Sequence, residues 1–453
     1  MNYTVRASTG DVFTLSSFSD VWRRESYYHE RLRLQSQDYQ YPKLRSPIFD
    51  DRDQCASSET HDIVKDLTWS KDGSTLVSVC EDFGVRMYVM PTDLCDGEHE
   101  EQENKIDAKL LNPLNRIFMN NSIISHSVNP GFDLYGEESY LYNFNNILIS
   151  ERQLPIKLVS LIPTEDNDSP VISHYQFRDI QNDRYFDSYS LKFISGNNFV
   201  AGSTNYLGVF NVDHFEPLAT FKLTNFLSLK NFGITSCIEP FKEPGSNCVY
   251  MGSYLNQFAA IDLDSQSTIV TKALTPKEHG IGNGIYQIIE SDNHNFVYLL
   301  SRKTNTIPIL DRRMGYEMVD QLQDWHGGAA AIDLTSQKCF GDLLGKNQGL
   351  LVGNQRNEVK VWKDCAIGIG GKPDLYLNVG NDLCSLNTSE HHFGDEPCDD
   401  VKSEATAIGS VRVNPNGDDN YNKKNIVAIA QGSRPPPSSS SSNVVVNGIK
   451  VYG

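Results

Sequence analysis

Two pairs of basic residues are the side chains whose type and spacing best suit them to bind a partner. Arg302 and Lys303 stand in one polar segment, and Arg312 and Arg313 directly follow the next apolar segment. Arginine and lysine contact phosphate groups, and arginine also stacks on nucleobases, so both pairs are candidate contacts to RNA or to a protein. The competing interpretation of each pair is an ordinary solvated turn. Because the pairs lie at opposite ends of one expected strand, they need not share a face.

Tyr254 is a further candidate contact, because it follows the apolar segment 248–253 at the position of a turn. A tyrosine ring exposed there can stack on a base of single-stranded RNA. The alternative is an aromatic residue that is half-buried at the end of a strand and packed against its neighbours. The sequence leaves both interpretations open.

Two glycine-rich segments are the nearest approach to a phosphate-binding motif. The segment 279–284 precedes an expected strand rather than a helix, and Pro373 stands where the segment 368–372 would need Ser or Thr to bind magnesium. Neither a G-x-S-x-G nor an H-E-x-x-H motif occurs. We therefore expect no catalytic residue, no cofactor site, no small-molecule substrate and no enzyme activity.

One cluster of potential zinc ligands is present near the C-terminal end. Cys384, His391, His392 and Cys398 have the spacing C-x6-H-H-x5-C, which is not that of a standard zinc finger. Adjacent histidines on a strand would also point to opposite faces. We expect a loop with incidental ligand types and no metal site.

A degenerate internal repeat indicates what must position these residues. In residues 66–89, three short apolar segments alternate with two tight polar turns, of which 70–74 contains a glycine. The same order returns in 191–210, 234–262, 285–311 and 331–362, and the third segments end about 50 residues apart, as in kelch repeats and slightly wider than in WD40 repeats. A further third segment is expected at 171–177, and the last repeat combines 426–432 with 448–452.

These repeats number seven and predict an all-β, seven-bladed WD40-type β-propeller with an N-terminal extension. A small sheet cannot bury both of its faces alone, so a closed ring of sheets is the physical solution. We place the propeller at 61–453 and the extension at 1–60, with a short helix at 21–34 and a ring-closing strand near 11–15. The segment 433–443, rich in proline and serine, is expected to be a disordered insert, and 96–107 and 380–404 to be polar loops.

The amino-acid composition narrows the cellular compartments and the kinds of partner that the protein can have. With 40 basic and 58 acidic residues the net charge is −18, which excludes a broadly basic RNA coat and favours protein contacts over naked RNA. The nine cysteines include no C-x-x-C pair, which favours a reducing compartment. No secretory signal and no membrane-length apolar run is seen. We expect a cytosolic or nuclear protein without a membrane partner.

The amino-acid sequence of the repeats resembles that of the telomerase Cajal body protein family. The segments L-T-W-S-K-D-G-S at 67–74 and V-R-M-Y-V-M-P at 85–91 are similar to its first blade, and 170–173, 233–238, 252–254 and 311–313 continue the match in order. The similarity runs from about residue 61 to the C-terminal end. Each motif alone is a weak WD40 signal, and the order of the motifs carries the resemblance.

The resemblance is greatest to fungal members of that family and implies a nuclear splicing factor. Such a protein would associate with spliceosomal small nuclear ribonucleoproteins and help the U1 particle stay on the 5′ splice site, as a scaffold that binds through its rim. Animal members instead bind small RNAs and deliver telomerase RNA, so a delivery factor for telomerase or guide RNAs is one alternative. A generic WD40 adaptor, such as a substrate receptor of a ubiquitin ligase, is another.

Overall fold

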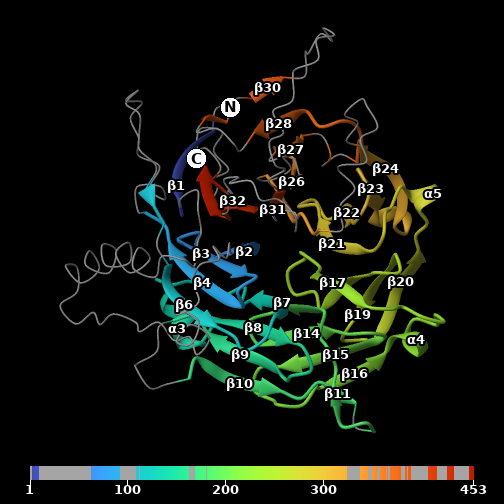
Figure 1. The fold of residues 1–453 in the computed structure, drawn as a ribbon. Coiled ribbons are helices and arrows are strands. Elements are labelled where there is room, and N and C mark those ends of the chain that lie inside the picture. The colour runs from blue at the N-terminus through green and yellow to red at the C-terminus, as the bar shows by residue number, and fades with distance from the viewer. Residues whose placement is uncertain are drawn as a thin grey trace, which may run out of the picture.

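Seven sheets built mainly of antiparallel strands form a closed ring (Figure 1). Their first strands line a central channel. The computed structural model describes residues 3–9, 63–91, 109–111, 113–162, 169–179, 181–323, 337–344, 349–354, 358–363, 365, 368–378, 383–384, 386–388, 407–415, 426–432 and 448–452. We number the sheets as blades 1 to 7 in chain order. The predicted fold class, a seven-bladed β-propeller, is confirmed.

In the first four blades, four strands follow each other from the channel outward. Blade 1 contains β2 (Val64–Trp69), β3 (Thr75–Cys80), β4 (Gly84–Val89) and β6 (Pro113–Phe118). Blade 2 contains β7 (Ile123–Val128), β8 (Asn146–Glu151), β9 (Ile156–Ser160) and β10 (Val171–Tyr175). Blade 3 contains β13 (Ser190–Phe193), β14 (Asn198–Gly202), β15 (Tyr206–Asn211) and β16 (Ala219–Lys222). Blade 4 contains β17 (Thr235–Pro240), β18 (Cys248–Ser253), β19 (Gln257–Asp262) and β20 (Ser267–Ala273).

The last two blades have additional edge strands. Blade 5 contains β21 (Ile285–Glu290), β22 (Phe296–Ser301), β23 (Thr306–Asp311) and β24 (Glu317–Gln323). Blade 6 contains β25 (Gly341–Leu343), β26 (Leu350–Gly353), β27 (Glu358–Trp362), β28 (Leu375–Asn378) and β30 (Leu386–Thr388). Blade 7 contains β31 (Ala407–Val413), β32 (Val427–Gly432), β33 (Gly448–Tyr452) and β1 (Tyr3–Ser8), with β29 (Leu383–Cys384) and β5 (Lys109–Leu110) beside β1.

Short elements occupy some of the connections between strands. They are α3 (Glu137–Leu141), α4 (Leu223–Phe226), α5 (Pro276–His279), the 3-10 turn η2 (Arg312–Met314) and the hairpin β11 (Arg178–Asp179) with β12 (Arg184–Tyr185). Among the described residues, no helix is long and apolar enough to cross a membrane.

The core lies between neighbouring blades. The second strands β3 and β22 are buried along their whole length, because each blade is covered on both faces by its neighbours. One cluster joins Val77 and Met87 of blade 1 to Ile147 and Val159 of blade 2, and similar clusters lie at the other blade contacts. Trp69, Tyr88 and Trp362, which the repeat pattern places in the core, are buried.

The first and last strands of the chain close the ring. β1 pairs antiparallel with β33, and the amide of Ile449 donates to the hydroxyl of Thr9 at 2.9 Å. Figure 1 shows the two strands side by side. The closing strand is therefore Tyr3–Ser8, earlier than the predicted segment 11–15, which lies outside the described residues, as does the predicted helix 21–34.

The sequence interpretation of blades 2 and 6 needs correction. The segment 171–177, predicted as a third strand, forms the fourth strand β10, and the inner strands of blade 2 are β7, β8 and β9. The inner strand β7 carries half-buried polar residues such as Ser125 and His126, so it gives no apolar signal. The first strand of blade 6 is β25, and the predicted segment 331–334 lies outside the described residues, together with 433–443 and 96–107.

Candidate functional site

Tyr254 and Arg302 form one stacked pair. The guanidinium carbon of Arg302 lies 4.4 Å from the centroid of the Tyr254 ring, and its Nη2 donates to the phenol oxygen at 2.9 Å. Tyr254 stands in the turn after β18 and Arg302 in the turn after β22, which is the second strand of the next blade. Both side chains are half-buried, and Arg302 also lines the mouth of the central channel. An arginine held on a ring keeps a fixed orientation toward a ligand.

The glycine-rich loop 280–284 joins these two turns, because it hydrogen-bonds to both. Asn256 of the first turn donates from Nδ2 to the carbonyl of Gly282 at 2.7 Å and accepts at Oδ1 from the amide of Gly284 at 2.7 Å. Toward the second turn, the amide of Asn283 donates to the carbonyl of Arg302 at 2.7 Å. The sequence predicts this segment as a loop but gives no sign that it positions the candidate residues.

Lys303 is the exposed neighbour of the pair. It adopts a positive φ of 56°, a conformation that a tight turn between two strands requires. Within the described residues, no carboxylate lies within ion-pair distance of its ammonium group. Lys303 therefore presents its charge to solvent beside the Tyr254–Arg302 pair.

Arg312 and Arg313 lie on the opposite face of the propeller. They follow β23, the third strand of blade 5, whereas Arg302 and Lys303 precede it. We call the side formed by turns after second strands the Arg302 face, and the side formed by turns after first and third strands the Arg312 face. Successive turns of an antiparallel sheet alternate between its two ends, so the candidate residues are divided between two surfaces.

Both arginines on the Arg312 face already bind carboxylates. Arg312 donates from Nη1 and Nη2 to the two oxygens of Glu243 at 2.9 and 3.0 Å and packs over the Phe241 ring. Arg313 donates from Nη2 to Asp311 at 2.7 Å. The Arg313 hydrogen bonds hold the pKa of the Asp311 carboxyl below its usual range. These guanidinium groups are already paired within the chain, so a partner on this face would have to compete with the carboxylates of Glu243 and Asp311.

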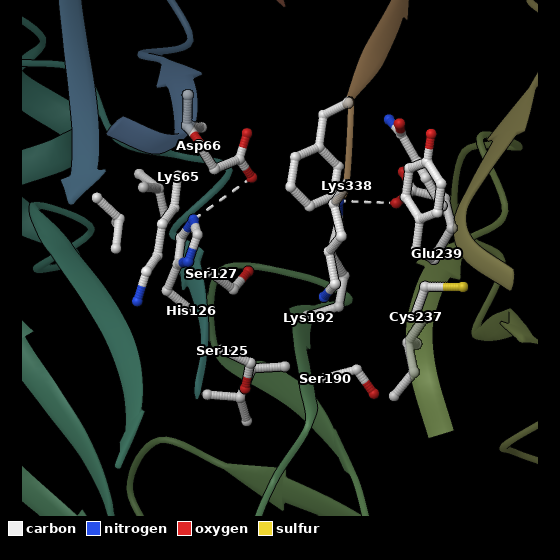
Figure 2. A pocket seen from close by; sticks show the side chains of 18 of the residues that line it. Lys65, Asp66, Ser125, His126, Ser127, Ser190, Lys192, Cys237, Glu239 and Lys338 are labelled. Carbon is white, nitrogen blue, oxygen red and sulfur yellow. Dashed lines mark ion pairs between the residues drawn. The ribbon is translucent and has the colours of Figure 1, made fainter. Parts of the chain in front are cut away.

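The central channel is a cavity of about 1020 Å³, lined by the first strands of the blades. Figure 2 shows Asp66 with His126 on one side and Lys192 near Glu239 on the other. The Lys192 ammonium lies 2.8 Å from the Glu239 carboxylate, and Asp66 lies 3.6 Å from Nε2 of His126. These charges were not expected from the sequence, because each inner strand supplies only one or two of them.

Arg412 connects three blades inside the channel wall. Its Nη2 donates to Oδ1 of Asp66 at 2.8 Å, and its Nε donates to the carbonyl of Leu67 at 2.9 Å, both in blade 1. Its Nη1 donates to the carbonyl of Gly341 in blade 6 at 2.9 Å. Asp66 also accepts from the hydroxyl of Ser410 at 2.9 Å. The Asp66 carboxylate in the channel wall is thus engaged in holding blades together.

Asp66→Asn should change how stability depends on pH. Burial alone would raise the pKa of the Asp66 carboxyl, but Arg412, His126 and Ser410 outweigh it and lower the pKa well below its ordinary value. The ionised carboxylate therefore stabilises the folded chain at neutral pH, and this contribution is lost as pH falls below about 4. Urea unfolding from pH 7 to pH 3 should show a gap in the free energy of unfolding between the native chain and the variant. This gap should narrow below about pH 4. A gap that stays constant would contradict this assignment.

Metal ligation finds no support among the residues described. No group of three or more His, Cys, Asp or Glu side chains there is arranged to hold a metal ion. Of the predicted cluster, Cys384 lies in β29 without a described side chain, and His391, His392 and Cys398 lie outside the described residues. The expectation of no metal site stays a prediction.

Three yeast proteins named Protein SWT21 are similar to this chain over most of its length. The protein from Candida glabrata is 32% identical over 404 residues, which cover 83% of this chain and 87% of the relative. The chain belongs to the Protein SWT21 family. The protein from Vanderwaltozyma polyspora is 30% identical and that from Kluyveromyces lactis 29% identical, each match covering 82% of this chain. No protein-family model matches the chain.

Membership in the SWT21 family agrees with the predicted fungal WD40-type family, and the seven-bladed propeller fold suits a scaffold. The wider resemblance to the telomerase Cajal body protein family stays a prediction. The Tyr254–Arg302 pair, with Lys303 beside it, is the candidate binding site of this SWT21 family member.

Proposed function

We propose that this SWT21 family member is a non-enzymatic nuclear scaffold that associates with spliceosomal small nuclear ribonucleoproteins and assists pre-mRNA splicing. Within that role, it stabilises the U1 particle on the 5′ splice site. The proposal combines the resemblance of the repeats with the propeller fold, which offers loops on a rigid ring for partner contacts. The observation that carries it is the stacked Tyr254–Arg302 pair beside the exposed Lys303.

The mechanism follows from mass action at this site. A scaffold that binds only the assembled particle shifts the equilibrium toward assembly. Lys303 and Arg302 would contact phosphates or acidic side chains, while Tyr254 holds Arg302 in place by stacking and a hydrogen bond. The Arg312 face is less suited to this contact, because Arg312 and Arg313 would first have to leave the carboxylates of Glu243 and Asp311.

The test is association measured for paired variants in the cells from which the chain comes. We expect Arg302→Glu with Lys303→Glu to reduce co-purified U1 RNA at least about tenfold after crosslinking, since charge reversal opposes every phosphate contact. The matched control is Arg313→Gln on the other face, whose side chain is 60% exposed. It should leave recovery unchanged. Fluorescence microscopy of the same tagged chain should place it in the nucleus.

Other outcomes of this experiment contradict the proposal in distinct ways. Recovery of telomerase or modification-guide RNAs in place of spliceosomal RNAs would move the function to RNA delivery. Recovery of one stable protein complex without RNA, for example ligase subunits, would move it to a generic adaptor. Loss of U1 RNA with Arg313→Gln but not with the double variant would move the contact to the Arg312 face.

A further inference from the structure

The loop 132–145 on the Arg312 face exposes large apolar side chains. It connects β7 to β8 in blade 2 and contains the short helix α3. Tyr135, Leu141 and Tyr142 are 68%, 77% and 63% exposed, and Leu141 is the most exposed of the large apolar residues described. Three such residues within eight positions of one loop, rather than scattered singly, are typical of an interaction surface. We call this segment the acidic–aromatic loop.

The loop is held in one conformation although its apolar side chains face solvent. Ser139 and Asn145 are 1% and 2% exposed, and the Ser139 hydroxyl donates to Oδ1 of Asn145 at 2.6 Å. The same hydroxyl accepts from the amide of Asp133 at 3.1 Å. Phe144 stacks on Tyr142 with ring centroids 5.6 Å apart. A buried polar network that fixes an exposed apolar surface reduces the ordering entropy that binding would otherwise cost.

The charge on this loop has one sign. Asp133, Glu137 and Glu138 lie within six positions, and the Asp133 carboxyl is in contact with that of Asp72 in the neighbouring turn of blade 1. In the part of the chain that the structure describes, no basic side chain lies within ion-pair distance of Glu137 or Glu138. Grouped carboxylates repel one another, and a cationic partner relieves that repulsion.

We propose that the acidic–aromatic loop is a docking surface for a basic protein segment that carries leucine-like side chains. The apolar side chains of the segment would cover Leu141 and Tyr142, and its arginines or lysines would lie against Glu137 and Glu138. The charge excludes the phosphates of RNA from this surface. A surface built on three exposed apolar side chains of one loop suits a short segment bound in a transient way. This inference is independent of the proposed function, which uses the Arg302 face.

The test uses the purified full chain and two short fluorescent peptides, one of leucine and arginine and one of leucine and glutamate. Fluorescence anisotropy should show binding of the leucine–arginine peptide that weakens between about 0.01 M and 0.15 M ionic strength. Glu137→Lys with Glu138→Lys should weaken this binding about tenfold or more. Leu141→Ser with Tyr142→Ser should have an effect of similar size, since it removes the apolar contact.

The matched control is Phe215→Ser with Leu218→Ser in blade 3. These side chains are 66% and 59% exposed on the same face, and their loss should leave binding unchanged. Exposed positions tolerate such changes, and thermal unfolding of each variant checks that it remains folded. Equal binding of the leucine–glutamate peptide, or equal weakening by the control, would overturn the proposal. So would sedimentation showing a dimer that Leu141→Ser with Tyr142→Ser dissociates, because the occupant would then be a second copy of this chain.

Discussion

Replacing Arg412 with alanine is expected to lower the free energy of unfolding by about 3–5 kcal/mol. The substitution removes three charged hydrogen bonds, to Asp66, Leu67 and Gly341, from a side chain that is 18% exposed. It also leaves the Asp66 carboxylate in the channel wall without its guanidinium partner. An ion left unpaired in such a place costs far more than a pair on the surface.

Urea unfolding at pH 7 measures this effect, and an exposed ion pair supplies the control. Arg178 and Asp183 lie 3.1 Å apart with side chains 42% and 87% exposed, so Arg178→Ala should cost less than about 1 kcal/mol. If the two variants lose the same stability, then Arg412 does not join blades 6, 7 and 1 in the way the geometry indicates. A double variant with Asp66→Asn should lose less than the sum of the single changes, because both act on one interaction.

Gly282→Ala is expected to destabilise the chain by about 1–3 kcal/mol and to separate the Tyr254–Arg302 pair. A Cβ atom at Gly282 would lie 1.8 Å from the carbonyl oxygen of Arg302, which is backbone and cannot rotate away. The loop or the Arg302 turn must therefore move. Binding through the Arg302 face should also weaken in the Gly282→Ala variant. Arg412→Ala, in contrast, should affect this binding only through the overall stability of the chain.

Thermal unfolding and RNA recovery together check this second expectation. Gly409→Ala is a suitable control, since its new Cβ would meet only one atom within 4 Å, the carbonyl oxygen of Val64 at 3.2 Å. Gly409→Ala should lower the stability of the chain less than Gly282→Ala does, and it should leave the recovery of RNA unchanged. A Gly282→Ala chain with unchanged melting temperature and unchanged association would show that the loop does not position Arg302.

The fold could be predicted from the sequence where strands are apolar and turns are tight. Blades 1, 3, 4 and 5 fulfil this condition, because their second and third strands are buried between neighbouring blades. In blade 2, the segment 171–177 was wrongly predicted as a third strand. The inner strand β7 faces the channel with polar side chains, so the sequence pattern did not show where the blade begins. β1 was placed too late in the chain, because pairing with a strand more than 400 positions away leaves no local pattern.

The candidate site was predicted in its residue types but not in its arrangement. Tyr254 and Arg302 lie 48 positions apart, and no spacing rule joins two turns from different blades. The pairing of Arg312 with Glu243 likewise depends on how blades 4 and 5 pack. The charged residues of the channel were not predicted. A single polar residue in a short strand gives the same sequence pattern whether it faces the channel or the outer solvent.

The pairing of β1 with β33 has a consequence for the order of synthesis. β1 is synthesised well before its partner β33, because 440 positions separate Thr9 from Ile449 at their contact. At about 5–20 residues per second, the nascent N-terminal strand waits from roughly 20 to 90 seconds for its neighbour. During that interval it is an open edge, able to pair with the wrong strand. A newly made chain would therefore depend on protection of β1 until β33 has been made.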